Sequence, residues 1–579
     1  MQTSDHEMPA TAAMRDSSTI PSISSHLDQF YIGRAWLYLF AIVAAYALAA
    51  TLLALRTPEW QNPDEPAHYN NVAYIASGAG LPVLAAGDYN QYYLETLVHS
   101  GFPRHLPISP LRYEAYQPPL FYVAATPIFL VTDGSLLALR LFNVLLGAIT
   151  ITLTFVSLTL VFPTKPLITV GATAFVALLP MHMAMNAAVN NDGLAELLLT
   201  AAVLTLLRWM RREFYQEAAA GGAAPRTWRP ATWNILVTLG VFIGLSMATK
   251  IYAYLALAIG AGMVWLVVWR QPRAHALEPA PGPVQGGWQR AAAGVVAALW
   301  LVVPAVLIVA PLWLRNILLY GAGDFLGLQF HDAVVAGQPT TAEYIHAFGW
   351  LAYAERAMEF TFNSFWGVFG WLGVFMEPRV YTLLLVFSGA IFLGILWAFV
   401  RFISGYPETD MDHFQFWVLG LFGVMIGAAF LAYGWYNVKF LQHQGRYFFW
   451  ALLPISCFVA LGWRELMQPL QGKVTGFLAG VLTLALAGLA LTNGMQDRLI
   501  VAAIGALAVL LVMQPFLLSG AVDPVIIGSP RRVQAWLGIP LLRPVLHVLR
   551  VLAWATPFVL LWLLDLMIPV WYIGPQLGQ

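Results

Sequence analysis

Apolar stretches of about 20 residues recur along most of this 579-residue chain, and a helix needs about this length to cross about 30 Å of hydrocarbon. A helix satisfies its own backbone hydrogen bonds, which the interior of a bilayer demands because it holds no water. Charged residues make up only 10% of the chain, whereas soluble domains carry roughly 25%. The pattern therefore predicts an all-α, polytopic membrane protein.

The apolar runs predict about thirteen membrane-spanning helices. Their expected positions are residues 36–55, 136–160, 166–184, 192–210, 232–248, 251–269, 292–314, 380–401, 413–434, 447–463, 474–493, 499–518 and 546–571. The segment 1–33 is polar and rich in Ser and Thr, and we expect it to be a disordered tail. It lacks the arrangement of a cleavable signal peptide, so the first helix is expected to remain as an anchor.

Basic residues in the short connectors predict the orientation of the chain. Four connectors share one side of the membrane under the thirteen-helix count, and they hold Arg208, Arg211, Arg212, Arg226 and Arg229, then Arg270, Arg273 and Arg290, then Arg464 and Lys473, and last Arg531, Arg532 and Arg543. By the positive-inside rule that side is the cytoplasm. The N-terminus is then cytoplasmic, and two long loops, at about 56–135 and 315–379, lie on the extracytoplasmic side.

The first of these loops contains the segment YEAYQPPLFYVAATPIFLV. Its apolar part is too short for a span, so we expect a helix that lies in the outer interface of the membrane.

Two classes of chemistry are excluded by composition. A net charge of zero without a basic block makes nucleic acid an unsuitable partner, and the single cysteine, Cys457, cannot form an intrachain disulfide or a cysteine-based metal site.

The motif PDEPAH places Asp64, Glu65 and His68 just after the first apolar helix. On a helical turn these three side chains approach one point, because residues three and four apart lie on one face. A carboxylate there can take a proton from a hydroxyl acceptor, or it can bind a divalent cation together with His68. The alternative is that Asp64 only caps a short helix whose entry is shaped by the prolines.

Two further motifs combine a polar residue with the tip of an apolar helix. NNDGLAE places Asp192 at a helix start, as an N-terminal cap or as a second acid of the same site. GLSMATK places Lys250 on the outer side, where it is a snorkelling anchor or a point charge for a phosphate. Arg315 and Arg446 fall on the same outer face, which the charge bias disfavours. An anionic ligand, such as a lipid phosphate, would explain them, and Arg140 could join them.

The order of the motifs PDEPAH, YQPPLFY, RLFN, NNDGLAE, GLSMATK, PLWLRN and QGRYFF resembles that of the GT-C superfamily of membrane glycosyltransferases. The similarity is greatest to the branch of the protein O-mannosyltransferases and the lipid A aminoarabinose transferases. It implies a GT-C-like bundle with a large first extracytoplasmic loop that carries interfacial helices. The resemblance divides the chain into the tail, a catalytic transmembrane domain over residues 34–450, and C-terminal scaffold helices over residues 451–579.

The resemblance implies inverting transfer of a sugar from a polyprenyl-phosphate donor to a hydroxyl acceptor, which is a glycan, a lipid or a protein, on the extracytoplasmic face. By motif, Asp64 matches the general base with Glu65 as its partner, and Asp192 matches a second acid. The side chains that would support Asp192 or the acceptor are Asn191 and Tyr116. The positions that match residues near the donor phosphate are Lys250 and Arg140.

One departure from the family pattern concerns the donor phosphate. Where the aminoarabinose transferases have a lysine before the proline of the interfacial helix, this chain has Gln117. Gln117 can hydrogen-bond a phosphate but cannot neutralise it, so Lys250, Arg315 or Arg446 would supply the charge. His68 occurs in only some branches, which leaves a divalent metal as an option. Two rival functions remain at this point, a transporter or flippase of lipid-linked glycans and a ligase that consumes them.

Overall fold

The computed structural model describes residues 34–219, 230–270, 287–335, 337–404, 411–493, 498–518 and 543–577. The predicted N-terminal tail lies outside the described residues, as do several of the basic connector residues, namely Arg226, Arg229, Arg273, Arg531 and Arg532. Helices dominate the described part, and its one sheet is an antiparallel pair of short strands, β1 (Val368–Phe369) and β2 (Val374–Phe375).

Long apolar helices form the body of the molecule, and ten in the described part are long and apolar enough to cross a membrane. They are α2 (Ala35–Arg56), α6 (Leu136–Val161), α9 (Asp192–Ala219), α11 (Tyr254–Trp269) with the preceding turn η2 (Ile251–Ala253), α12 (Gly287–Tyr320), α15 (Pro378–Ile403), α16 (His413–Lys439), α17 (Leu452–Leu466) with the preceding turn η3 (Gly445–Ala451), α18 (Pro469–Asn493), and α22 (Arg543–Ile568) with η4 (Pro569–Ile573) and α23 (Gly574–Leu577). The shorter apolar helices include α10 (Pro230–Met247) and α19 (Arg498–Leu518).

Each of the thirteen predicted spans corresponds to a helix, but the count of thirteen is not confirmed. The span expected at 166–184 is broken into α7 (Pro166–Ala177) and α8 (Pro180–Asn186), which are bent by 59°. The break falls before Pro180 because a proline lacks the backbone N–H and its ring prevents the preceding helix from continuing. Counting this pair as one span gives eleven. The second long loop also begins later than expected, because α12 continues to Tyr320.

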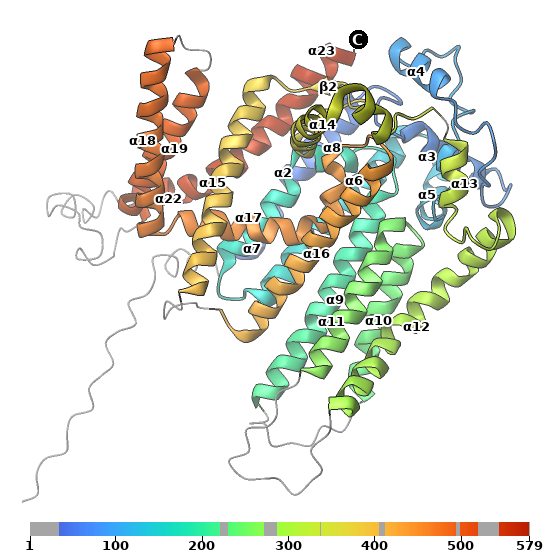
Figure 1. Cartoon of the computed structure of the whole chain (residues 1–579), viewed down its shortest axis with the longest axis horizontal. Coiled ribbons are helices and arrows are strands. Elements are labelled where there is room, and N and C mark those ends of the chain that lie inside the picture. Colours follow the sequence, from blue (N-terminus) through green and yellow to red (C-terminus); the bar gives the residue numbers. More distant parts are fainter. Residues whose placement is uncertain are drawn as a thin grey trace, which may run out of the picture.

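Shorter elements gather at one end of the bundle (Figure 1). They are α3 (Glu65–Ala76), α4 (Gln91–Ser100), η1 (Tyr113–Tyr116), α5 (Leu120–Val131), α13 (Leu328–Val334) and α14 (Thr341–Trp366). Helix α5 has 12 residues and is therefore about 18 Å long, too short to cross the hydrocarbon, as expected for an interfacial helix. We call this end of the bundle the site end, since the polar motifs of the sequence lie there.

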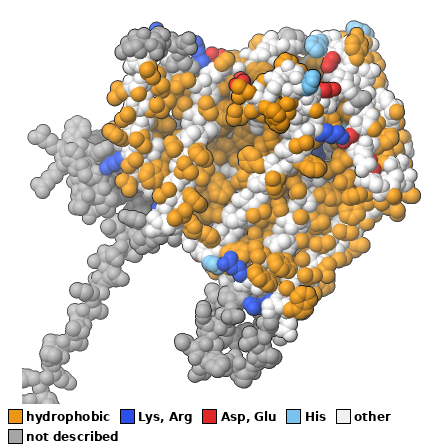
Figure 2. Space-filling model, in the orientation of Figure 1, with side chains coloured by type: hydrophobic (Ala, Val, Ile, Leu, Met, Phe, Trp, Pro, Cys, Tyr) orange, Lys and Arg blue, Asp and Glu red, His pale blue; other side chains and the backbone are white. Residues whose placement is uncertain are grey.

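Helix α9 relates the site end to the basic connectors. Asp192 begins the helix, and Arg208, Arg211 and Arg212 follow it along the same helix. At 1.5 Å per residue they lie about 24–30 Å further along the axis. The site end is therefore opposite the arginine-rich end of α9. The face of the molecule in Figure 2 is covered mainly by hydrophobic side chains, with most of the charged ones near its upper and lower edges, as expected for a membrane protein.

Two hydrophobic clusters hold the bundle together, one around α2, α15 and α22 and the other around α9–α12 and α16, and both include residues of α7 and α17. Helices α15 and α17 approach closely where glycines face each other. A Cβ atom built on Gly394 would lie 2.0 Å from the carbonyl oxygen of Gly462, so neither residue can carry a side chain there. Small residues at helix contacts are the usual means of close packing in a bilayer.

Candidate active site

Asp64 stands at the start of α3 but does not cap it. Its backbone is left-handed, with φ 64°, and its side chain makes no capping hydrogen bond. The carboxylate instead accepts a hydrogen bond from the Tyr113 hydroxyl at 3.0 Å and forms an ion pair with Arg446 at 2.9 Å. A left-handed aspartate is uncommon and costs free energy. The turn between Pro63 and Pro66 therefore directs the carboxylate away from the helix and into the site.

Arg446 reaches Asp64 because the preceding residue is a glycine. A Cβ atom built on Gly445 would lie 2.3 Å from the backbone nitrogen of Phe365, so η3 can lie against α14 only without a side chain there. The N–H of Gly445 donates to the Ser364 hydroxyl at 2.8 Å, which fixes this contact. The QGRYFF motif thus provides a close approach followed at once by a cation.

Lys250 forms a second ion pair at the same end. Its Nζ atom lies 3.1 Å from Asp192 and donates to the side-chain oxygen of Asn191 at 2.7 Å. The backbone N–H of Asp192 donates to the side chain of Asn190 at 2.9 Å, so Asn190 occupies the role of a capping residue. Asp192, whose carboxylate pairs with Lys250, supplies charge to the site. Asn191 also contacts Gln117 at 3.4 Å.

The two ion pairs belong to one site. His68 interacts electrostatically with Lys250 and Asp192 from the second pair and with Asp64 and Arg446 from the first. These four charged residues come from four separate segments, namely the start of α3, the first residue of α9, the residue before η2, and η3. Asp64 and Lys250 therefore both lie near the same histidine.

The electrostatics keep Asp64 ionised and His68 neutral. Burial raises the pKa of Asp64, but the charge of Arg446 and the hydrogen bonds from Arg446 and Tyr113 outweigh it and hold that pKa below its usual value. Burial and the Lys250 charge lower the pKa of His68 to about 3. Its Nδ1 atom lies 2.9 Å from the Tyr122 hydroxyl. At neutral pH the site thus holds an anionic aspartate beside a neutral imidazole.

The sequence left a divalent metal, held by His68 with Asp64 or Glu65, as an option. In the part of the chain that the structure describes, no group of three or more His, Cys, Asp or Glu side chains is arranged to hold a metal ion. Glu65 is bound to Arg140, so Asp64 is the carboxylate that stays predicted as the partner of His68 at a metal.

Glu65 and Arg140 form a closed ion pair of their own. The distance from the Arg140 Nη2 atom to Glu65 is 2.6 Å, and the side chains are 4% and 0% exposed. All five N–H groups of Arg140 are used, two by Glu65 and three by the backbone oxygens of Ala54, Thr57 and Pro58. The expectation that Arg140 binds a donor phosphate is therefore wrong, because it has no donor to offer. The Glu65 carboxylate is equally engaged in this pair, and its role as the partner of Asp64 stays a prediction.

Three other predicted residues have separate positions. Arg315 donates to the backbone oxygen of Pro82 at 2.6 Å and anchors the first long loop. Gln117 donates to the Tyr116 hydroxyl at 3.1 Å, and the ring of Tyr116 lies 4.1 Å from that of His331. Tyr116 and Gln117 thus border the site, whereas the structure ties Arg315 to a loop.

Sequence reasoning missed two residues of the site, Tyr113 and Glu114. Tyr113 binds Asp64, and Glu114 is buried between the charges of Asp64 and Lys250. In the sequence, these two residues stand out only because they come just before the QPP sequence. The segment otherwise has the pattern of the start of an interfacial helix. A carboxyl group there could have been recognised only once the burial of η1 was known.

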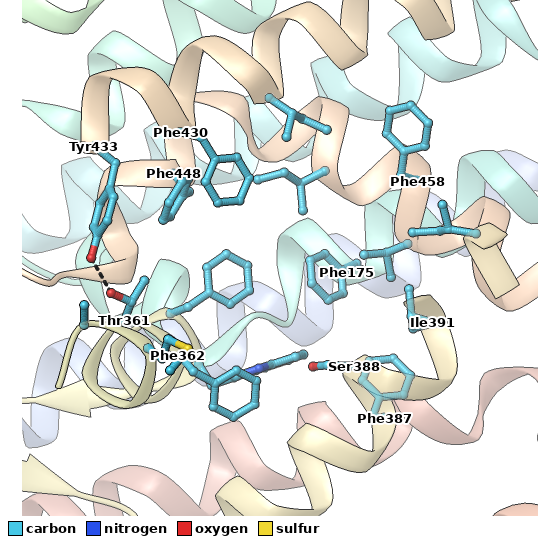
Figure 3. Close-up of a pocket in the computed structure, with 18 residues that line it drawn as sticks. Phe175, Thr361, Phe362, Phe387, Ser388, Ile391, Phe430, Tyr433, Phe448 and Phe458 are labelled. Atoms are coloured by element: carbon cyan, nitrogen blue, oxygen red, sulfur yellow. Dashed lines mark hydrogen bonds between the residues drawn. The ribbon is translucent and has the colours of Figure 1, made fainter. Parts of the chain in front are cut away.

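A largely apolar cavity of about 660 Å³ adjoins η3 (Figure 3). It is enclosed mainly by side chains of α14, α15, α16, η3 and α17. Phe448, two residues after Arg446, lines it together with Phe430 and Phe362, and the polar members include Thr361 and Ser388. One short turn thus carries a cation of the charged site and an aromatic wall of the cavity.

No protein-family model matches the sequence, and no curated protein matches it. Among solved structures, the chain is similar to ArnT from Cupriavidus metallidurans bound to undecaprenyl phosphate, with a TM-score of 0.41 and 15% identity over 92% of this chain and 77% of that chain. It is also similar to the oligosaccharyltransferase of Archaeoglobus fulgidus in the apo form, with a TM-score of 0.42 and 12% identity over 82% of this chain and 54% of that chain. The chain therefore spans about half the length of the archaeal protein. Similarities at this level carry no argument for function, which depends on the site.

Proposed function

We propose that the protein is a membrane glycosyltransferase that moves a sugar from a polyprenyl-phosphate donor to a hydroxyl acceptor at the extracytoplasmic face. The observation that carries this proposal is the meeting of two ion pairs, Asp64 with Arg446 and Lys250 with Asp192, around one neutral histidine at the site end. An ionised carboxylate supplies a base, and the cations supply partners for a phosphate. The motif resemblance to the GT-C superfamily supports the same reading.

In the proposed reaction Asp64 accepts the proton of the acceptor hydroxyl while that oxygen bonds to the anomeric carbon. The bond between the sugar and the phosphate oxygen breaks on the opposite side, and its electron pair stays on the phosphate, so the configuration inverts. Arg446 and Lys250 exchange part of their contact with the carboxylates for contact with the phosphate. Because negative charge grows on the leaving phosphate, these cations stabilise the transition state more than the ground state.

The cavity beside η3 offers a place for the polyprenyl tail. Its lining is almost entirely hydrophobic, and burial of apolar surface is what a polyprenyl chain gains by entering it. Arg446 and Phe448 are two residues apart on η3, so a lipid whose tail contacts Phe448 has its phosphate within reach of the charged site. This arrangement supports a lipid-linked donor over a soluble nucleotide sugar.

Incubation of the purified protein with labelled polyprenyl-phosphate sugars and a panel of glycan, lipid and protein acceptors tests the function. Transfer of the labelled sugar with release of the lipid phosphate is expected. Net movement of the intact lipid-linked sugar across a vesicle membrane, without release of the phosphate, would instead identify a flippase. Transfer of a preassembled glycan but of no monosaccharide would identify a ligase.

The first prediction concerns Lys250. The Lys250→Met variant should raise the Kd for undecaprenyl phosphate by about 10–100-fold, because a hydrogen bond to a charged group is worth about 1.5–3 kcal/mol. The turnover of bound donor should change less. Lys439→Met is the matched control, since Lys439 is an exposed lysine paired with Asp332, and its Kd should stay at the wild-type value. If the wild type and Lys250→Met bind the donor lipid with equal affinity, Lys250 does not bind the phosphate.

The second prediction concerns the cavity. Ile426 of α16 lines it, whereas Val424 of the same helix is 56% exposed. Ile426→Trp should raise the Kd for undecaprenyl phosphate about tenfold, which corresponds to about 60 Å² of lost apolar contact at about 25 cal/mol per Å². Val424→Trp should leave the Kd unchanged. If both variants bind the lipid as tightly as the wild type, the tail does not occupy this cavity.

A further inference from the structure

Glu114 is a buried carboxyl group without a role in the reaction above. It lies in η1 and is 9% exposed. Its Oε2 atom has no hydrogen-bond partner among the described residues, and neither has the Oδ1 atom of Asn71. The Asn71 amide group donates to the backbone oxygen of Glu114 at 2.8 Å, so these two residues are neighbours. Buried acceptors without partners are costly, so this part of the site is completed by a proton on Glu114 or by a ligand.

The charges around Glu114 do not balance if it is ionised. Arg446 already pairs with Asp64, and Lys250 already pairs with Asp192. A third carboxylate would leave one negative charge in excess at the place where the proposed function requires a phosphate. Like charges at short range in a buried site repel strongly. Phosphate binding is therefore favoured if Glu114 is neutral.

The surroundings of Glu114 favour its neutral form. Burial raises the pKa of Glu114 and the Asp64 charge raises it further, to about 7, although the Lys250 charge, a hydrogen bond with the Gln117 side chain and the Arg446 charge act in the opposite direction. Four tyrosines also interact electrostatically with Glu114, namely Tyr113, Tyr116, Tyr122 and Tyr436. Asp192 and the neutral His68 of α3 are the other titratable side chains of the site. Asp64, by contrast, has a pKa below its usual value. When the pKa values of two neighbouring carboxyl groups are shifted in opposite directions, the ionised group can act as a base and the protonated group can donate a hydrogen bond.

We propose that Glu114 is a phosphate-binding residue that carries a proton on Oε2 and donates it in a hydrogen bond to the phosphate of the polyprenyl donor. The inference rests on the function proposed above and adds a neutral acid to its phosphate site. No covalent bond forms or breaks in this step, because the proton stays on Oε2 and a phosphate oxygen accepts the hydrogen bond. As the bond to the sugar breaks, charge accumulates on that oxygen and the hydrogen bond strengthens.

Binding of undecaprenyl phosphate to the full-length protein in detergent between pH 6 and pH 8 tests the proposal. Below about pH 7 Glu114 holds its proton, and above it the carboxylate repels the phosphate. Relative to Glu114→Gln, the wild-type protein should lose about tenfold in affinity between pH 6 and pH 8. The glutamine keeps an N–H donor and never ionises, so this variant reports only the ionisation of the phosphate itself. Glu355→Gln, at an exposed position of α14, is the control and should follow the wild type.

Infrared spectroscopy of the same proteins supplies a measurement that does not depend on the ligand. A carbonyl band of a protonated carboxyl group should disappear as the pH rises through about 7 and should be missing in Glu114→Gln. Absence of this band in the wild type at pH 6 overturns the proposal, as does an equal pH dependence of binding in wild type and Glu114→Gln. In the latter case the proposed glycosyltransferase survives. If no form of the protein binds undecaprenyl phosphate at any pH, both proposals fail together.

Discussion

Replacement of Asp64 by asparagine should lower the turnover of sugar transfer by about 10²–10⁴-fold, the usual contribution of one general base. The amide cannot take the proton of the acceptor hydroxyl, although it fits the same space. Binding of undecaprenyl phosphate should survive or become tighter, because Arg446 loses its carboxylate partner at 2.9 Å and is freed for the phosphate. The measurement is turnover with labelled donor, together with the Kd for undecaprenyl phosphate.

Asp133 provides the matched control for this variant. It is also an aspartate with a left-handed backbone, with φ 49°, but it is exposed and lies within the turn after α5. Asp133→Asn makes the same chemical change at the same backbone strain and should leave turnover unchanged. If Asp64→Asn keeps more than about a tenth of the wild-type turnover, Asp64 is not the general base.

The largest effect on stability is expected for Arg140→Met. Removing one partner of a buried ion pair leaves the other charge uncompensated and costs about 3–5 kcal/mol. Glu65 is 0% exposed, and three backbone oxygens lose their donors as well. The free energy of unfolding, measured by denaturant or heat in detergent, should fall by about this amount.

The double variant Glu65→Met with Arg140→Met separates the charge effect from packing. It should recover part of the lost stability, because an apolar pair carries no buried charge. Undecaprenyl phosphate should bind the folded Arg140→Met protein with wild-type affinity, since Arg140 has no free N–H group. If Arg140→Met has normal stability but binds undecaprenyl phosphate more weakly than the wild type, Arg140 contacts the donor phosphate and its structural role is contradicted.

The sequence predicted the class of fold because hydrophobic length and backbone hydrogen bonding leave a membrane-spanning chain little choice. It also predicted that α5 lies outside the spans, since 12 residues cannot cross the hydrocarbon. The break between α7 and α8 was missed, because a run of apolar residues looks continuous even where Pro180 bends it. The count of thirteen is not confirmed, because two of the expected spans, α10 and α19, fall among the shorter apolar helices.

Within the candidate site, the sequence singled out Asp64, Asp192, Lys250 and Arg446, because a charged side chain next to an apolar helix is energetically costly and is usually retained for a function. It did not identify their partners. That Asp64 binds Arg446, 382 residues away in the chain, depends on how α14 and η3 pack. Arg140 was expected at the phosphate for the same reason as Lys250, yet α6 turns it towards the end of α2, where Glu65 and three carbonyls surround it.

Composition and hydropathy alone determined that this chain is a helical bundle with its polar motifs near helix ends, because the cost of an unpaired polar group in hydrocarbon acts on every residue independently of its neighbours. Only the tertiary structure decided which charges are available to a ligand and which are neutralised internally, and that Glu114 is buried among them. Ion pairing and burial depend on distances between segments far apart in the sequence, and helix packing sets those distances.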